Sequence, residues 1–219
     1  MDSSAWDERY AAHDLVWGLE PNRWVAEEVS ALVPDDAGSP RALDLAAGEG
    51  RNAIWLARRG WRVTAVDFSA VALERGRRLA AEAGAGATPG SAAGGSVDWV
   101  RADLTQWQPE PGAYGLVLVV YLQLPSELRR PVLRRAAAAL APGGTLLIVG
   151  HDSANLTEGV GGPQDPAVLY TAEDLLDDVR DLGLSTVRAG RAVRPVETGD
   201  GVVREAIDAL VRLERPGVR

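Results

Sequence analysis

The stretch RALDLAAGEGRNAIWLARRGWRVTAV, residues 41–66, decides the fold of this chain. Its apolar spacing predicts a strand, a glycine turn, a helix and a second strand, over residues 42–46, 48–50, 52–59 and 62–66. The first strand carries one acid, Asp44, near its end, and the second strand leads into Asp67. Because the strands of a βαβ unit end at the same edge of a parallel sheet, we expect both acids and the turn to meet where open α/β sheets bind ligands.

The turn also carries a motif. Asp44-x-Ala46-x-Gly48-x-Gly50 resembles the first motif of the class I S-adenosylmethionine-dependent methyltransferases, acid-x-Gly-x-Gly-x-Gly, with Ala46 in the place of the first glycine. Residues 48–57, GEGRNAIWLA, resemble in particular the tellurite-resistance and thiopurine methyltransferase branch, which acts on small molecules. The resemblance implies S-adenosylmethionine as the cofactor and a small molecule as the methyl acceptor.

The same glycines leave other interpretations open. Gly48-x-Gly50-x-x-Ala53 also satisfies the dinucleotide-binding fingerprint, and Asp67 stands 17 positions after Gly50, near the expected spacing of about 20. An NAD(P)-binding oxidoreductase would normally have an apolar residue in place of Asp44, which favours the methyltransferase. A third interpretation is a module that binds S-adenosylmethionine without catalysis, because a fold alone does not establish an activity.

Composition narrows the class of protein. A chain of 219 residues with 46% hydrophobic residues suits one domain, with an N-terminal lid and helix in residues 1–40, a cofactor-binding core in 41–150, and a substrate-side loop and hairpin in 151–219. The net charge is -8 and all 23 basic residues are arginines without an evident basic patch, so we expect no nucleic-acid partner. The absence of cysteine and the presence of only two histidines argue against a metal site. No signal peptide or membrane span is evident, so we expect a cytoplasmic protein.

The downstream sequence completes the predicted sheet. Apolar runs predict strands over residues 97–102, 114–121 and 145–149, helices over 70–83, 126–140 and 172–182, and a turn at 141–144. Residues 84–96 are rich in glycine, alanine and serine and are expected to form a surface insertion. Two strand-like runs, 184–196 and 202–213, flank the hairpin signal TGDG. The predicted fold is therefore α/β, a doubly wound Rossmann-like sheet of seven strands, mostly parallel, with an antiparallel strand from the C-terminal hairpin.

The resemblance assigns the cofactor contacts to strand ends and to the N-terminal segment. Asp67 resembles the acid that accepts hydrogen bonds from both ribose hydroxyls, and Asp103 resembles the acid that binds the adenine amine. Aromatic residues near the N-terminus resemble a lid over the cofactor and substrate. The residues expected at the cofactor are Tyr10, Trp17, Asp44, Ala46, Gly48, Gly50, Asn52, Asp67, Phe68, Ser69, Asp103, Leu104 and Tyr121.

His151 is the candidate catalytic residue. It follows the fifth predicted strand, where a histidine could orient or deprotonate a nucleophile, and the glycine- and proline-rich loop over residues 153–168 could wall the substrate pocket. The alternative is that His151 and Asp152 form a loop pair whose side chains hydrogen-bond the backbone. The acceptor itself, whether a thiol, a chalcogen, a hydroxyl or a carboxylate, stays open at this point.

Overall fold

The computed structural model describes residues 7–8, 20–32, 40–85 and 95–217. Its first half follows the predicted alternation of strands and helices: α2 (Arg23–Val29), β1 (Arg41–Leu45), α3 (Arg51–Ala57), β2 (Arg62–Asp67), α4 (Ala70–Glu82) and β3 (Ser96–Arg101). The second half contains β4 (Tyr114–Val120), α5 (Ser126–Ala138), β5 (Leu140–His151), α6 (Asn155–Glu158), the 3-10 helix η1 (Pro166–Val168), α7 (Ala172–Asp178), β6 (Ser185–Glu197) and β7 (Val203–Glu214).

Seven strands form one sheet in the order β3-β2-β1-β4-β5-β7-β6. The pairs among the first five strands are parallel, and β7 lies antiparallel between β5 and β6. This arrangement confirms the predicted fold class, including the antiparallel strand supplied by the C-terminal hairpin. It also places the carboxyl ends of β1, β2, β4 and β5 along one edge of the sheet.

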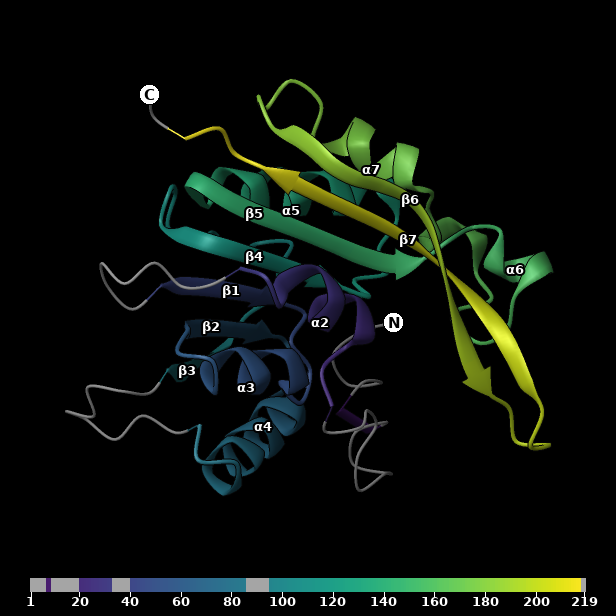
Figure 1. Cartoon of the computed structure of the whole chain (residues 1–219), viewed down its shortest axis with the longest axis horizontal. Helices are drawn as coiled ribbons and strands as arrows, with labels where there is room; N and C mark the ends of the chain where they lie inside the picture. Colours follow the sequence, from purple (N-terminus) through teal and green to yellow (C-terminus); the bar gives the residue numbers. More distant parts are fainter. Residues whose placement is uncertain (1–6, 9–19, 33–39, 86–94, 218–219) are drawn as a thin grey trace.

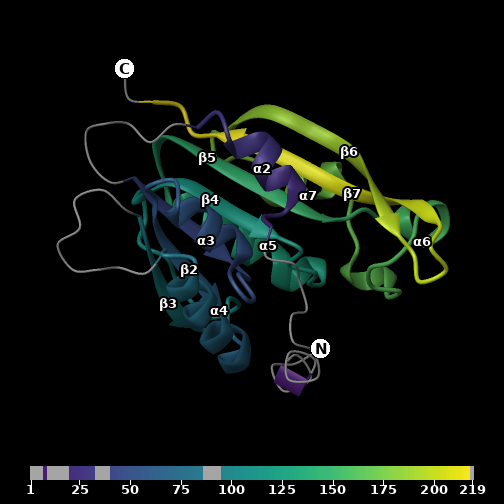
Figure 2. The ribbon, with the colours of Figure 1, turned by 60° about the horizontal axis from the view of Figure 1, so that its bottom comes forward.

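Helices cover both faces of this sheet (Figure 1). Helices α2, α3 and α4 lie on one face, and α5 and α7 lie on the other, as the rotated view in Figure 2 also shows. The central strand β4 is apolar along its whole length, and β1 is apolar except for Arg41 and Asp44, because both faces of these strands are buried. Their alternate side chains enter two separate hydrophobic clusters, one with Leu43 and Val117 and one with Ala42 and Leu116.

The hairpin of β6 and β7 extends beyond the helices at one end of the molecule (Figures 1 and 2). Its pairing continues for twelve registered positions, from Ser185 opposite Glu214 to Glu197 opposite Val203. Within the described ranges, no helix has the length and apolarity needed to cross a membrane.

Pro131 lies inside α5 as an exposed residue, while Val132 and Leu133 are buried. Two local predictions differ from the structure. The predicted turn 141–144 lies within the irregular start of β5, where the register with β4 shifts. Helix α7 ends at Asp178 and not at residue 182, because Asp181 and Gly183 adopt left-handed backbone conformations that stop a right-handed helix.

Candidate functional site

The glycine turn between β1 and α3 is built from left-handed residues. The φ angles are +60° at Ala46, +56° at Gly48 and +80° at Gly50. A Cβ on Gly50 would lie 2.2 Å from the ring of Trp99, so both conformation and space require glycine there. Ala46 has the conformation for which the family pattern uses glycine, and an alanine in that region carries steric strain, which proteins retain mostly at functional sites.

Asp44 is the most unusual group at this edge. Its side chain is 1% exposed, and neither carboxylate oxygen has a hydrogen-bond partner within the described part of the chain. Burial, reinforced by the negative charge of Asp67, raises the pKa of Asp44 to about 7, while the charge of Arg51 and the nearby backbone N–H of Ala53 act in the opposite direction. A buried carboxylate without hydrogen bonds is costly. The residue is therefore suited to a cationic ligand group that would supply the missing partner.

Asp67, at the end of β2, holds the turn in place. Its Oδ2 accepts a hydrogen bond of 2.8 Å from the N–H of Gly48, and its Oδ1 accepts one of 2.9 Å from the N–H of Ser69. Burial raises the pKa of Asp67, and these backbone hydrogen bonds act in the opposite direction. Each carboxylate oxygen has a second lone pair. Asp67 can therefore fix the turn and still accept hydrogen bonds from a ligand.

Ser69 connects this edge to the N-terminal segment. Its Oγ accepts a hydrogen bond of 3.1 Å from the N–H of Ala72, which caps α4, and it donates a hydrogen bond to the carboxylate of Asp7. Phe68, beside it, is partly buried, and its carbonyl accepts a hydrogen bond from Arg101. Asp7 of the N-terminal segment thus lies at the start of α4, near Asp67.

The other expected cofactor residues have distinct environments. Asp103 is exposed, and its Oδ1 accepts hydrogen bonds from the backbone N–H and the hydroxyl of Thr105, while Leu104 is buried. The Oδ1 of Asn52 accepts a hydrogen bond of 2.9 Å from the N–H of Asn22, so this side chain fastens the start of α2 to α3. The predicted lid residues, Tyr10 and Trp17, lie outside the described residues.

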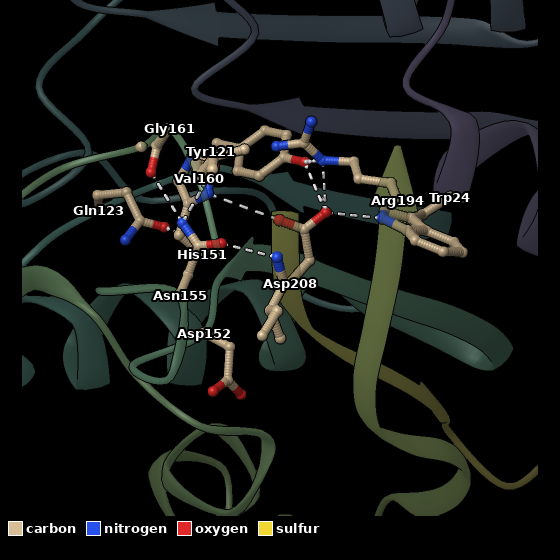
Figure 3. A network of polar contacts seen from close by, with 12 residues as sticks. Trp24, Tyr121, Gln123, His151, Asp152, Asn155, Val160, Gly161, Arg194 and Asp208 are labelled. Carbon is tan, nitrogen blue, oxygen red and sulfur yellow. Dashed lines mark hydrogen bonds and ion pairs between the residues drawn. The ribbon is translucent and has the colours of Figure 1, made fainter. Parts of the chain in front are cut away.

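A polar cluster lies at the ends of β4 and β5 (Figure 3). At its centre is Asp208 of β7, a side chain with 0% exposure. Its Oδ2 accepts hydrogen bonds from the indole N–H of Trp24 at 2.8 Å, the hydroxyl of Tyr121 at 2.9 Å and the Nε of Arg194 at 2.8 Å. The cluster joins α2 to β6, to β7 and to the residue that follows β4.

Two residues of this cluster were expected at the site. Tyr121 follows β4 with a φ of +57°, and burial, strengthened by the charge of Asp208, raises its pKa to about 12. His151 is the last residue of β5, and its ring lies 4.7 Å from that of Tyr121, centroid to centroid. Burial lowers the pKa of His151. The structure therefore brings the candidate base and a candidate cofactor residue together.

Sequence reasoning did not find Asp208, Arg194 or the polar role of Trp24. The available signal was Asp208, a single acid within the apolar run AIDALV of residues 206–211. Such an acid in a buried strand requires partners. Its partners come from elements distant in the sequence, so the cluster could not be assembled from local spacing.

Comparison with known proteins agrees with the geometry of this edge. A family model described as a methyltransferase domain matches residues 42–144, which span β1 to the start of β5. Residues 42–144 of this chain are thus similar to a methyltransferase domain. The motif of Asp44, Ala46, Gly48 and Gly50 lies within the matched region.

Two curated relatives are similar to part of this chain. A trans-aconitate 2-methyltransferase of Paracidovorax citrulli is 35% identical over 127 residues, covering 56% of this chain and 43% of that protein. A 2-heptyl-1-hydroxyquinolin-4(1H)-one methyltransferase of Mycobacteroides abscessus is 25% identical over 138 residues, covering 62% of this chain and 57% of that protein. The chain thus spans about half the length of the curated relatives it matches.

A solved structure resembles nearly the whole chain. The N-methyltransferase NodS of Bradyrhizobium japonicum, in complex with S-adenosyl-L-homocysteine, has a TM-score of 0.68 and 19% sequence identity, covering 98% of this chain and 100% of that chain. At this identity the likeness concerns the fold, which is that of S-adenosylmethionine-dependent methyltransferases. Among the residues whose positions are given, no group of three histidine, cysteine or acidic side chains could hold a metal ion.

Proposed function

We propose that this protein binds S-adenosylmethionine at the carboxyl edge of β1 and β2 and transfers its methyl group to a heteroatom of a small molecule. The observation that carries the proposal is Asp44, a buried carboxylate without hydrogen bonds in the described part of the chain, beside a strained glycine turn in a matched methyltransferase domain. S-adenosylmethionine carries positive charge on its sulfonium and on its ammonium group. It would therefore supply the partner that Asp44 lacks.

The residues around the turn fit the rest of this cofactor. Asp67 has lone pairs available for the ribose hydroxyls, and Gly48 has no side chain to keep a ligand away from the backbone. Asp103 and Leu104 stand after the next strand, β3, and would contact the adenine. Phe68 and Ser69 follow Asp67, the acid proposed for the ribose. The family resemblance adds Tyr10 and Trp17 as a lid. When bound, the cofactor supplies a methyl group that is already activated for transfer.

The protein then has to align the acceptor and exclude water, because the leaving group needs no further activation. The cluster of Tyr121, His151 and Arg194 stands beyond the turn, and the loop after β5 reaches it, since a Cβ on Gly162 would lie 2.9 Å from the His151 ring. Asn155 holds that loop by donating a hydrogen bond of 2.8 Å to the carbonyl of Gly161 and by accepting one of 2.7 Å from the N–H of Ile207. This arrangement supports an enclosed acceptor pocket between the loop and the cofactor.

The acceptor belongs to the small heteroatom nucleophiles. The names of the two relatives point to trans-aconitate, which bears carboxylates, and to an N-hydroxyquinolone. Residues 48–57, which resemble the tellurite-resistance and thiopurine branch, point instead to thiols and chalcogens. A screen should therefore contain all of these acceptors.

Two measurements test the proposal. Calorimetry should show binding of S-adenosylmethionine and S-adenosylhomocysteine but not of NAD, and S-adenosylhomocysteine release should exceed the background for at least one acceptor. Tight binding of NAD alone would establish the dinucleotide alternative. Cofactor binding without turnover on any acceptor, unchanged by removal of residues 1–17, would instead indicate a binding module.

A further inference from the structure

His151 and Asp208 face each other across paired strands. His151 of β5 is in register with Asp208 of β7, and its Nδ1 lies 3.6 Å from Oδ1 of Asp208. Both atoms are buried, and neither has a hydrogen-bond partner within the described ranges. An N–H···O hydrogen bond requires about 2.7–3.2 Å. A movement of about half an ångström would therefore join these two atoms and satisfy both.

The other oxygen of Asp208 is already occupied. Oδ2 accepts the three hydrogen bonds from Trp24, Tyr121 and Arg194, which hold the carboxylate in a single orientation (Figure 3). Oδ1 is then directed at the imidazole and is left for it. The distance between His151 and Asp208 therefore depends on the three hydrogen bonds that hold Oδ2.

The imidazole is confined on its other sides. Its ring packs against that of Tyr121, and a Cβ on Gly162 would lie 2.9 Å from it. The main-chain N–H of His151 donates a hydrogen bond of 3.0 Å to Oε1 of Gln123, whose Nε2 donates one of 2.7 Å to the carbonyl of Val168. The side chain keeps 12% exposure. Since Nδ1 is buried against Asp208, Nε2 is the ring nitrogen left for a ligand.

We propose that Asp208 positions His151 as the catalytic base for acceptors that carry a proton on the reacting atom. This inference rests on the proposed methyl transfer. With Nδ1–H donated to Asp208, the lone pair of Nε2 takes the proton from the acceptor hydroxyl as its oxygen forms a bond to the cofactor methyl carbon. The carbon–sulfur bond breaks, the sulfur keeps the electron pair, and the imidazolium later releases its proton to water.

The groups around the ring suit this role. Asp208 of β7 favours the imidazolium, Arg194 of β6 disfavours it, and the hydroxyl of Tyr121 is neutral, since its pKa is raised to about 12. Burial has the largest effect and lowers the pKa of His151, so the ring is neutral and able to accept a proton near pH 7. Asp208 would stabilise the cation that forms only during the reaction, which is where catalysis requires stabilisation.

Asp208→Asn tests the positioning role without depending on turnover. The chain contains only two histidines, so His13→Gln assigns the imidazole signals in a nuclear magnetic resonance titration. Loss of the carboxylate should lower the pKa of His151 by about one unit or more, since a facing opposite charge shifts a pKa by that amount. It should also reduce the fraction of the ring protonated at Nδ1.

Asp178→Asn is the matched control. Asp178 is also a fully buried aspartate, 1% exposed and paired with Arg129 at 2.6 Å, but it lies on α7 away from His151. It should lose stability without changing the titration of His151. If Asp208→Asn fails to fold, Asp208→Glu and the tautomer of His151 in the unaltered protein decide the matter, because a ring protonated at Nε2 would overturn the proposal.

Turnover supplies the second readout. With a hydroxyl acceptor, His151→Ala should lower kcat by about 100-fold or more, and the acidic limb of the pH profile should move down with the pKa of His151 in Asp208→Asn. With a thiolate acceptor, both variants should keep most of their rate. Equal losses for both acceptors, or an unchanged His151 titration in Asp208→Asn, would overturn the assignment. Absence of turnover in the unaltered protein would refute the proposed function, while the titration would still test the pairing.

Discussion

Replacing Asp44 by asparagine should stabilise the protein at high pH while weakening its binding of S-adenosylmethionine. The substitution preserves shape and removes the charge from a buried site that lacks hydrogen bonds within the described part of the chain. In the folded protein the pKa of Asp44 is raised to about 7, compared with 3.8 for an unperturbed aspartate. Between pH 3.8 and about pH 7, the Asp44 carboxyl is therefore protonated in the folded state and ionised in the unfolded state.

The sign and size of the effect follow from this difference. Because the folded state binds more protons, the free energy of unfolding falls as pH rises from about 4 to 7, and it stays lower above pH 7. At about 1.4 kcal/mol per pH unit, the ionisation of Asp44 accounts for a loss of about 2.5 kcal/mol between pH 5 and pH 8. Asparagine has no such dependence. The free energy of unfolding of Asp44→Asn minus that of the unaltered protein should therefore rise by about this amount from pH 5 to pH 8. A contribution of the buried amide itself would be the same at both pH values.

Urea unfolding of the unaltered protein and Asp44→Asn at pH 5 and pH 8 measures this difference directly. Asp103→Asn, at an exposed aspartate of the same edge, is the control that should follow the unaltered protein. Calorimetry on the same samples should show that Asp44→Asn binds S-adenosylmethionine more weakly, and that the unaltered protein loses affinity below pH 7. A difference in unfolding free energy between the unaltered protein and Asp44→Asn that is the same at both pH values would refute the reasoning.

Three further results are expected. Asp67→Ala should weaken cofactor binding by about 2 kcal/mol or more in calorimetry, because it removes charge-assisted hydrogen bonds. An unchanged affinity would show that Asp67 only fixes the turn. Ala46→Gly should raise the free energy of unfolding by about 1 kcal/mol, because glycine adopts a φ of +60° without strain; a lower stability would show that the alanine methyl packs usefully. Gly162→Ala should lower kcat more than Gly161→Ala does, because the Cβ at residue 162 would displace the ring of His151. Gly161→Ala, with no atom within 4 Å of its Cβ, is the control for backbone strain alone.

The positions of the two strand-end acids and the glycine turn could be predicted from sequence because their determinants are local. Asp44, the glycine turn and Asp67 lie within one βαβ unit, and a repeating pattern of buried strand, turn and helix places them. The antiparallel strand from the C-terminal hairpin followed from the hairpin signal together with the family resemblance. Helix ends were harder to place, as α7 shows, because single left-handed residues decide them.

The acceptor side could not be predicted to the same extent. Trp24, Tyr121, His151 and Arg194 gather around Asp208, and they come from separate parts of the sequence. In sequence, the indole of Trp24 belongs to an amphipathic helix and Arg194 to an exposed edge strand, so both have ordinary explanations. Their hydrogen bonds depend on strand register and on the packing of α2, which are properties of the assembled sheet.

The position of β7 in the sheet has a consequence for how the chain folds. β7 is the last described strand in chain order, yet it lies between β5 and β6. During synthesis from the N-terminus, β5 can pair with β4 but must wait for β7 on its other side, and an unpaired apolar strand edge promotes association between chains. Closing this long-range pairing is expected to be slow. Incomplete chains would therefore depend on protection by chaperones until the hairpin is made, and the acceptor side of the site would assemble after the cofactor side.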